Sequence, residues 1–391
     1  MTLPSLPSLP SLPSSVYVAG LASLAVAVLL VLTKRWHGRF TLDSIRGIQK
    51  MHQHPTPRVG GIAIVAGVFA GWAVARPEPA QILGTLLLAG LPAFGFGLAE
   101  DLTKKVSVSA RLLATMASGV LGWLLTGVSL TSLDIPWVDP LLQNTLISVA
   151  FTAFAVGGVA NAVNIVDGFN GLASGFVVIA LGGLAAVAAV VGDMNLAMAC
   201  TAIAAAMMGF WLINWPWGKL FLGDGGSYFG GFALAWASVL LIERNHGVSA
   251  FVPLLICIHP VTEVLFSIYR RRVTHTSPGA PDRLHLHTLM MRRVVSPWLA
   301  RLYPNEPALA RLLRNPVTGM VLAVMTLPAV AVGLLVLNST WLGAAACVLF
   351  ALGYITLYAR LVRFKWCSPV TFLLFSPVVA SAARPRKIKK A

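Results

Sequence analysis

Eleven apolar segments recur along the chain, and each has roughly 17 to 21 residues, enough to cross the hydrocarbon core of a bilayer as an α-helix. Only 11% of the 391 residues are charged, whereas soluble domains carry about 25%. We therefore expect an all-α polytopic membrane protein with about eleven transmembrane helices. The predicted spans lie at about 16–33, 58–75, 80–99, 112–128, 142–162, 173–191, 195–213, 226–243, 250–268, 316–336 and 341–361.

The positive charges alternate with these spans and predict the orientation of the chain. With the N-terminus in the periplasm, all but two of the 29 lysines and arginines, Arg76 and Arg244, lie in cytoplasmic segments, if Arg58 at the mouth of one span is included. Cytoplasmic loops carry such an excess, so we expect the C-terminus in the cytoplasm. The net charge of +16 follows this alternation and no nucleic-acid motif, which indicates a lipid bilayer and not a nucleic acid as the partner.

The two ends of the chain differ in composition from the predicted transmembrane domain, which covers 16–361 and includes a cytoplasmic loop at 269–315. Residues 1–15 repeat Leu-Pro-Ser without any charge. This predicts a disordered tail and not a cleaved signal peptide, because a signal peptide opens with positive charges. Residues 362–391 form a basic tail with a short apolar stretch at 368–382, which we expect at the membrane interface against anionic headgroups.

Polar residues gather at the cytoplasmic ends of the predicted spans. One stretch, from Asn161 to Asn170, contains amides, a carboxylate and glycines at the end of an apolar run. A second polar stretch, Asp224-Gly225-Gly226-Ser227, lies at the end of another apolar run. Polar groups there are costly unless they have partners or water. We interpret both stretches as walls of one polar site. Four of the 13 acidic residues lie where helices meet this face, namely Glu100, Asp101, Asp167 and Asp224.

The residue types at this face favour phosphoryl transfer. Carboxylates without cysteine ligands, beside Lys, Arg and His, suit a hard divalent cation shared with phosphate oxygens. Mg²⁺ needs only one or two protein carboxylates when a diphosphate supplies the other ligands. The glycines after Asp167 and Asp224 let backbone amides approach anionic oxygens at a helix start. Phosphoryl transfer requires a metal, cations on the equatorial oxygens and a carboxylate near the attacking oxygen.

Two of these features also have a structural interpretation when each is taken alone. Asp224 or Ser227 can act as the cap of a helix. The pair Glu100-Asp101, followed by two lysines, can be a solvated loop at the end of a span. Their common placement on one side of the membrane, together with the other polar residues, favours a functional site.

The amides and the histidines also allow both a structural and a functional interpretation. Asn161, Asn164 and Asp167 would share one face of a helix, so they can also form a hydrogen-bond ladder between helices in lipid. His285 and His287 alternate in the long loop and can make structural hydrogen bonds there. Neither alternative is excluded by the residues themselves.

Three motifs together resemble those of the polyprenyl-phosphate N-acetylhexosamine-1-phosphate transferases, within glycosyltransferase family 4. They are Pro-Thr-Pro-Arg-x-Gly-Gly at 55–61, Asn-x-x-Asn-x-x-Asp-Gly at 161–168, and Asn-x-Pro at 214–216 leading to Phe-x-Gly-Asp-x-Gly-Ser at 221–227. The resemblance covers about 34–315 and is highly specific, because the motifs occur in the right order and on the right side. It implies a bacterial inner-membrane enzyme that uses Mg²⁺ or Mn²⁺, a UDP-sugar and undecaprenyl phosphate.

The resemblance also implies roles for individual residues. Asp224 matches the principal metal ligand. Asp101, with Glu100, matches paired acidic residues that act on the lipid phosphate or on the metal. The candidate catalytic residues are thus Asp101, Glu100, Asp167, His285 and His287. The candidate substrate-binding residues are Arg58, Lys104, Asn161, Asn164, Asn214, Phe221 and Arg283, of which Phe221 matches a contact to uracil.

Several positions depart from the family pattern. Glu100 replaces the first of two adjacent aspartates, so Asp101 is favoured as the acting carboxylate, and Asn170 stands where many members have an aspartate. Thr288 occupies a common histidine position, and the tri-histidine run of the peptidoglycan branch is absent. This argues against a UDP-MurNAc-pentapeptide donor and favours a UDP-N-acetylhexosamine. Glu263 resembles a family acidic residue whose role the sequence leaves open.

We therefore expect transfer of an N-acetylhexosamine 1-phosphate, GlcNAc-1-phosphate above others, from its UDP-sugar to undecaprenyl phosphate with release of UMP. This would initiate a cell-surface glycan such as O-antigen. A secondary transporter of an anionic solute is the rival from another class, although transporters place binding groups near the bilayer midplane in repeated elements. A catalytically inactive scaffold of the same family is the second alternative. The sequence does not decide whether the protein forms a homodimer.

Overall fold

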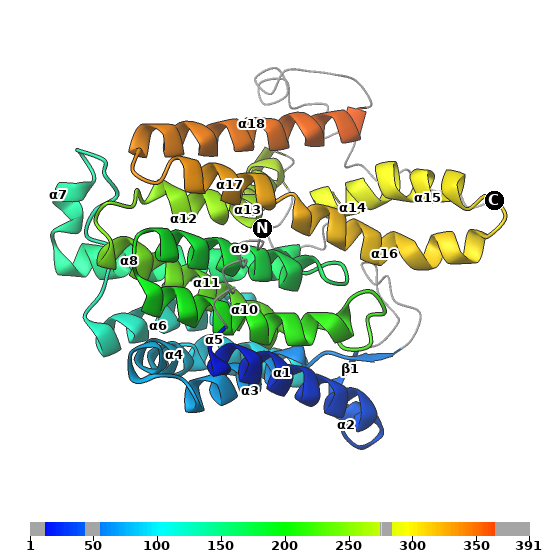
Figure 1. Ribbon diagram of the computed structural model, residues 1–391. Coiled ribbons are helices and arrows are strands. Elements are labelled where there is room, and N and C mark those ends of the chain that lie inside the picture. Colours follow the sequence, from blue (N-terminus) through cyan, green and yellow to red (C-terminus); the bar gives the residue numbers. More distant parts are fainter. Residues whose placement is uncertain (1–11, 44–54, 274, 276–283, 364–391) are drawn as a thin grey trace, which may run out of the picture.

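The chain forms one bundle of helices in which a single pair of short strands is the only sheet among the described residues. The computed structural model describes residues 12–43, 55–273, 275 and 284–363 (Figure 1). The expected all-α class is confirmed. The first elements are α1 (Ser14–Leu32), α2 (Lys34–Thr41), β1 (Leu42–Asp43), β2 (Thr56–Pro57), α3 (Gly60–Ala73), α4 (Pro77–Ala89), α5 (Leu91–Thr103), α6 (Val108–Thr126), α7 (Asp139–Leu142) and α8 (Thr145–Val166).

The second half of the chain is also helical. Strands β1 and β2 of the first half pair antiparallel, with Leu42 opposite Pro57, and lie beside α2 at one end of the bundle (Figure 1). The remaining elements are α9 (Leu172–Val190), α10 (Met194–Asn214), α11 (Gly223–Arg244), α12 (Phe251–Ile256), α13 (Ile258–Val273), α14 (Leu286–Met290), the π-helix η1 (Met291–Val295), α15 (Ser296–Leu302), α16 (Pro307–Val324), α17 (Leu327–Leu335) and α18 (Thr340–Arg363).

Every predicted apolar span corresponds to a helix or to two consecutive helices. Among the described residues, eight helical segments are long and apolar enough to cross a membrane, and the bent pair α4–α5 makes nine. This pair bends by 47° next to Gly90, and the predicted span at 250–268 is divided into α12 and α13. The chain is a multi-pass membrane protein. Its eleven crossings and its orientation stay predictions.

Polar caps explain where several of these helices begin. Ser107, Asn144 and Asp193 precede α6, α8 and α10, and each accepts hydrogen bonds from backbone N–H groups of the first turn. Such side chains satisfy donors that have no partner within the helix. The apolar runs that follow then need no other signal to form helices in lipid, because a helix satisfies its own backbone hydrogen bonds.

Helix α11 forms the centre of the bundle. Within its most apolar 18-residue window, 94% of the residues are buried, the highest share of any candidate span. Its core side chains Phe229, Phe232 and Trp236 are fully enclosed by the neighbouring helices. Because lipid gives little hydrophobic advantage to helix association, close packing must hold this centre together. The first turn of α11, which contains Asp224, is thereby fixed in position.

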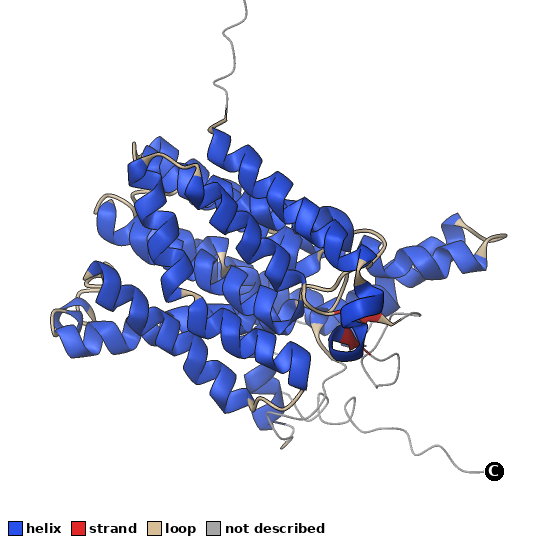
Figure 2. Cartoon of the chain, turned by 90° about the horizontal axis from the view of Figure 1, so that it is seen from below, coloured by secondary structure: helices blue, strands red, loops and turns tan. Residues whose placement is uncertain are grey.

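The segment 269–315, whose conformation the sequence left open, is largely helical where it is described. Helix α16 begins at Pro307, inside the expected loop, and continues through Pro316 into the bundle. The end of η1 and helix α15 pack on it, because Val295, Leu299 and Ala310 form one apolar cluster. The two helices form an arm that extends beyond the bundle (Figure 2). The expected tail at 1–15 is described only from residue 12, and the interfacial stretch at 368–382 lies outside the described residues.

Candidate active site

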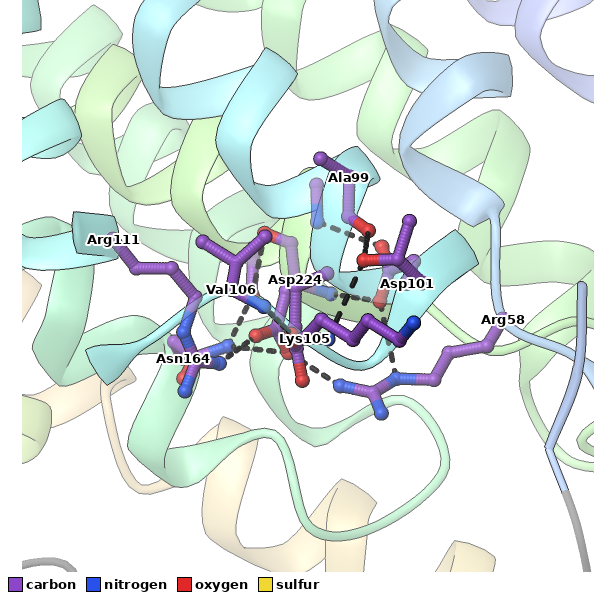
Figure 3. A network of polar contacts seen from close by, with 12 residues as sticks. Arg58, Ala99, Asp101, Lys105, Val106, Arg111, Asn164 and Asp224 are labelled. Carbon is purple, nitrogen blue, oxygen red and sulfur yellow. Dashed lines mark hydrogen bonds and ion pairs between the residues drawn. The ribbon is translucent and has the colours of Figure 1, made fainter.

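Three helix ends and one strand meet at the same end of the bundle as β1 and α2. Asp224 lies in the first turn of α11, Asp101 near the end of α5, and Asn164 in the last turn of α8. Arg58 follows β2 directly, and its backbone N–H donates to the carbonyl of Thr41. These polar side chains are therefore brought together from segments far apart in the sequence, as expected, and Figure 3 shows them converging.

The carboxylate of Asp224 is at the centre of a charged cluster. Arg58 Nη2 lies 2.5 Å from its Oδ1, and Asn164 Nδ2 donates to the same oxygen at 3.2 Å. Arg111 Nη1 donates to Oδ2. Asp224 is only 4% exposed, and a buried carboxylate needs such charged and hydrogen-bonding partners. The predicted metal ligand is thus held in one orientation, with two guanidinium groups beside it.

The carboxylate of Asp101, a residue of α5, binds the backbone at the start of helix α11. Its Oδ1 accepts a hydrogen bond from the backbone N–H of Asp224 at 2.8 Å, and its Oδ2 accepts one from Gly225 at 2.9 Å. Arg58 Nε lies 3.1 Å from Oδ1. The N-terminus of a helix attracts anions, and here the anion is a carboxylate of the protein itself. The backbone amides that we expected to approach substrate oxygens therefore already bind Asp101.

Close packing of glycines allows this arrangement. Gly61 of α3 lies so near α11 that a Cβ atom there would come within 2.4 Å of the backbone nitrogen of Gly226. Gly223 has φ of 74°, and a Cβ atom there would lie 2.5 Å from Asp101 Oδ2. Glycine is the residue that adopts this backbone conformation without strain. The glycines in the motifs at 55–61 and 221–227 thus let the carboxylates meet.

The turn after α8 connects the charged cluster with the two histidines. Asp167 is half-buried at the C-cap of α8, and Gly168 follows it. A Cβ atom on Gly168 would lie 2.8 Å from Nε2 of His287, and the Phe169 ring packs edge-on against the His287 ring at 5.3 Å. His287 in turn stacks on His285. The structure therefore places both predicted histidines next to the Asp167 turn.

Burial raises the pKa of Asp167 to about 7, although Arg58 lowers it, and Asp224 raises it further. The folded protein then binds a proton more tightly than the unfolded chain between about pH 4 and pH 7, so its stability falls as the pH rises through this range. We expect the melting temperature of the metal-free protein to decrease from about pH 4 to about pH 7. Scanning fluorimetry should show a smaller decrease for Asp167→Asn. Equal slopes in both proteins would contradict this assignment.

Two predicted site residues make hydrogen bonds to groups outside the Asp224 cluster. Glu100 Oε2 accepts a hydrogen bond from the backbone N–H of Val106 at 2.8 Å, which closes the connection between α5 and α6. Asn161 Nδ2 donates to Thr115 Oγ1 and to the carbonyl of Gly157, both at 2.8 Å. Asn161 therefore makes the hydrogen bond between helices that the structural interpretation predicted, whereas Asn164 contacts the charged cluster. The catalytic role of Glu100 and the substrate contact of Asn161 stay predictions.

The predicted nucleotide contacts lie at the end of α10 and in the segment between α10 and α11. Asn214 is buried, accepts from the backbone N–H of Gly171 and donates to the carbonyl of Leu220 at 2.8 Å. The backbone N–H of Phe221 donates to the carbonyl of Pro57 at 2.8 Å. These residues join the motifs to each other, and their substrate contacts stay predictions. Lys104 is exposed at the end of α5, and Arg283 lies outside the described residues.

Arg111 is the site residue that our sequence reasoning missed. It lies in the first turn of α6 and is one of the two arginines on Asp224. An arginine directly beside the predicted span at 112–128 is a signal that was available, because a charge at the end of a membrane span needs a partner or water. The motifs did not indicate it, since Arg111 stands 113 residues from Asp224 in the sequence.

The donor set fits Mg²⁺ only if a substrate contributes ligands. No group of three or more His, Cys, Asp and Glu side chains that could hold a metal occurs in the part of the chain that is described. The donors near Asp224 are carboxylate and amide oxygens, which Mg²⁺ prefers over sulfur. Mg²⁺ is commonly bound by one or two carboxylates together with phosphate oxygens and water. The residues present therefore suit a cation that arrives with a phosphorylated substrate.

Comparison with known proteins identifies relatives of this chain. The sequence model of glycosyl transferase family 4 matches residues 83–242. A Yersinia pestis protein named undecaprenyl-phosphate alpha-N-acetylglucosaminyl 1-phosphate transferase is 31% identical over 252 residues, which are 62% of this chain and 68% of that protein. The protein of the same name from Escherichia coli K12 is 29% identical over 254 residues, 62% and 67% of the two chains. A probable undecaprenyl-phosphate N-acetylglucosaminyl 1-phosphate transferase of Bacillus subtilis is 26% identical over 270 residues, 68% and 75%.

Proposed function

Because the chain belongs to glycosyl transferase family 4, we propose that it transfers GlcNAc-1-phosphate from UDP-GlcNAc to undecaprenyl phosphate and releases UMP. The observation that carries the proposal is the cluster of Arg58, Arg111 and Asn164 around the Asp224 carboxylate at the ends of membrane-spanning helices. The relatives named above are transferases of this kind. The lipid tail would lie in the bilayer while its phosphate reaches a soluble nucleotide sugar at this end of the bundle.

The reaction requires positioning more than proton transfer. A phosphate oxygen of the lipid attacks the sugar-side phosphorus of the donor, and the bond from this phosphorus to the UMP oxygen breaks. A phosphate monoester is already largely ionised near neutral pH, with a second pKa of about 6. Arg58 and Arg111 would bind the negatively charged oxygens in line for attack, since guanidinium groups suit phosphate. Positioning and charge stabilisation account for most catalysis of this type.

Asp224, with Asn164 next to it, would hold Mg²⁺ together with the diphosphate of the donor. Bound there, Mg²⁺ supplies positive charge that stabilises the leaving phosphate. To bind it, Asp224 must exchange contacts with Arg58 and Arg111, and both guanidinium groups then become available to the substrate phosphates. The present ion pairs thus keep the carboxylate and the arginines in place before the substrate arrives.

The proposed donor follows from the two histidines and from the absence of the tri-histidine run of the peptidoglycan branch. His285 and His287 stack against each other at 5.2 Å beside the Asp167 turn, where they would face the diphosphate. Because Thr288 stands at a position where a further histidine is common and the tri-histidine run is absent, a UDP-N-acetylhexosamine is favoured over UDP-MurNAc-pentapeptide. The product would begin a cell-surface glycan such as O-antigen at the cytoplasmic face of a bacterial inner membrane.

The proposal predicts UMP release that depends on both substrates. Purified protein in lipid nanodiscs, given undecaprenyl phosphate and Mg²⁺, is expected to release UMP from UDP-GlcNAc and much less from UDP-GalNAc, UDP-glucose or UDP-MurNAc-pentapeptide. Coupled detection of UMP measures this, with reactions that lack lipid phosphate or contain EDTA as controls. Folded protein that releases UMP from none of these donors would contradict the transferase and favour an inactive scaffold.

A further inference from the structure

A buried carboxylate outside the charged cluster connects the last helix with the two histidines. Glu263 of α13 is 1% exposed. Its Oε1 lies 2.8 Å from Nδ1 of His285, and its Oε2 accepts a hydrogen bond from the Tyr354 hydroxyl at 2.7 Å. The backbone N–H of Leu286 also donates to this carboxylate, at 3.3 and 3.4 Å. Each carboxylate oxygen therefore has a partner, and the partners come from α18 and from the start of α14.

We infer that Tyr354 is a positioning residue, which fixes His285 and, through it, the face of the site formed by both histidines, by orienting Glu263. This inference rests on the proposed function, because it assigns a task to the histidines in that reaction. It gives Glu263 the role that the sequence left open. It also gives a role to α18, which lies outside the residues matched by the family model.

A second contact from α18 supports the same interpretation. Tyr358 lies one turn after Tyr354, and its hydroxyl lies 2.8 Å from Nη1 of Arg270. The same nitrogen donates to the carbonyl of Leu284 at 2.7 Å, immediately before His285. Helix α18 therefore holds the backbone before His285 through one tyrosine and the His285 ring through the other.

The geometry also explains why the hydroxyl of Tyr354 matters. A carboxylate enclosed by protein must keep its hydrogen-bond donors, because a missing donor leaves charge without compensation. Without the hydroxyl, Glu263 can turn toward other donors, and the Nδ1 contact of His285 then changes. The His285 ring stacks on the His287 ring with an angle of 15° between their planes. A rotation of His285 would thus move His287, whose Nε2 lies beside Gly168.

The test removes one hydroxyl group and follows both activity and local order. Tyr354→Phe is compared with Tyr17→Phe, the same change at a tyrosine that is 53% exposed on α1. We expect Tyr354→Phe to lower kcat roughly tenfold and to leave KM for UDP-GlcNAc within about twofold, since one hydrogen bond to a charged group is lost. Hydrogen exchange should become faster at 284–290 but not in α11. Tyr17→Phe should change neither quantity.

A second variant tests the connection through Glu263. Glu263→Gln keeps the shape of the side chain and removes its charge, and we expect a loss of kcat at least as large. Because both changes act on one chain of contacts, the double variant should be no slower than Glu263→Gln alone, whereas independent effects would multiply. Multiplicative losses would overturn the inference.

The remaining outcomes separate the inference from the proposed function. Unchanged kcat and exchange in Tyr354→Phe, beside an active wild type, would overturn the inference and leave the function intact. Faster exchange throughout the helices, or failure to fold, would also overturn it, because the hydroxyl would then support the whole fold. If the wild type has no activity, the proposed function fails, and the exchange at 284–290 still decides whether Tyr354 orders the histidines.

Discussion

Replacing Asp224 by asparagine is expected to lower Mg²⁺-dependent UMP release by at least about 100-fold, because stabilisation of charge by a bound metal contributes several kcal/mol to such reactions. Asparagine has nearly the same shape but no charge, so it can neither hold the cation as firmly nor balance Arg58 and Arg111. Steady-state kinetics over a Mg²⁺ titration measure the effect. The concentration of Mg²⁺ for half-maximal rate should rise together with the loss of rate.

The matched control for this change is Asp134→Asn. Asp134 is exposed at the other end of the bundle, where its carboxylate accepts a hydrogen bond from Thr340. This variant loses the same charge far from the cluster and should keep the wild-type rate. An Asp224→Asn protein that is folded and retains more than about a tenth of the activity would contradict the assignment of Asp224 as the metal ligand.

Replacing Gly61 by alanine is expected to destabilise the protein by about 3 kcal/mol, which is near the upper range for overpacking. The added Cβ would overlap the backbone nitrogen of Gly226 at 2.4 Å, and a backbone at the centre of the bundle cannot move aside easily. Helix α3 would have to separate from α11, and the start of α11 carries Asp224. The melting temperature in detergent should fall by several degrees, and UMP release should fall with it.

Gly158→Ala provides the control for this prediction. Gly158 lies in helix α8, and a Cβ atom there would have no neighbour within 4 Å. Alanine has a higher helix propensity than glycine, by about 1 kcal/mol, so this variant should be as stable as the wild type or more so. A Gly61→Ala protein with wild-type melting temperature would show that α3 and α11 are not fixed as closely as described.

Hydropathy and charge alone predicted the class of fold, because the bilayer imposes a strong requirement on length and composition. All eleven apolar segments correspond to helices or pairs of helices. The breaks were not predicted, namely the bend beside Gly90, the division next to Cys257 and the division between α16 and α17. Such breaks depend on which helices pack around a segment, which no local pattern contains. Helix α15 and the first turns of α16, before residue 316, escaped prediction for a related reason, since they are too short and too polar to resemble spans.

For the site, the motifs predicted which residues meet but not what each of them contacts. Arg58, Asp101, Asn164 and Asp224 converge as expected. The contact of Asp101 with the start of α11 could not be read from the sequence, because it joins residues 123 positions apart. The same holds for Arg111 and for the Tyr354–Glu263–His285 connection. Contacts between helices that are distant in the sequence depend on how the helices pack, and this packing cannot be read directly from a single sequence.

The most direct test of the proposed reaction follows the phosphorus atom itself. UDP-GlcNAc labelled with radioactive phosphorus at the sugar-side phosphate is incubated with the protein in nanodiscs, undecaprenyl phosphate and Mg²⁺, and the lipid is extracted. We predict that the label enters the lipid fraction, and that donor labelled at the uridine-side phosphate yields labelled UMP instead. Label that stays water-soluble, or uridine-side phosphate that enters the lipid, would contradict the transfer of GlcNAc-1-phosphate by this protein.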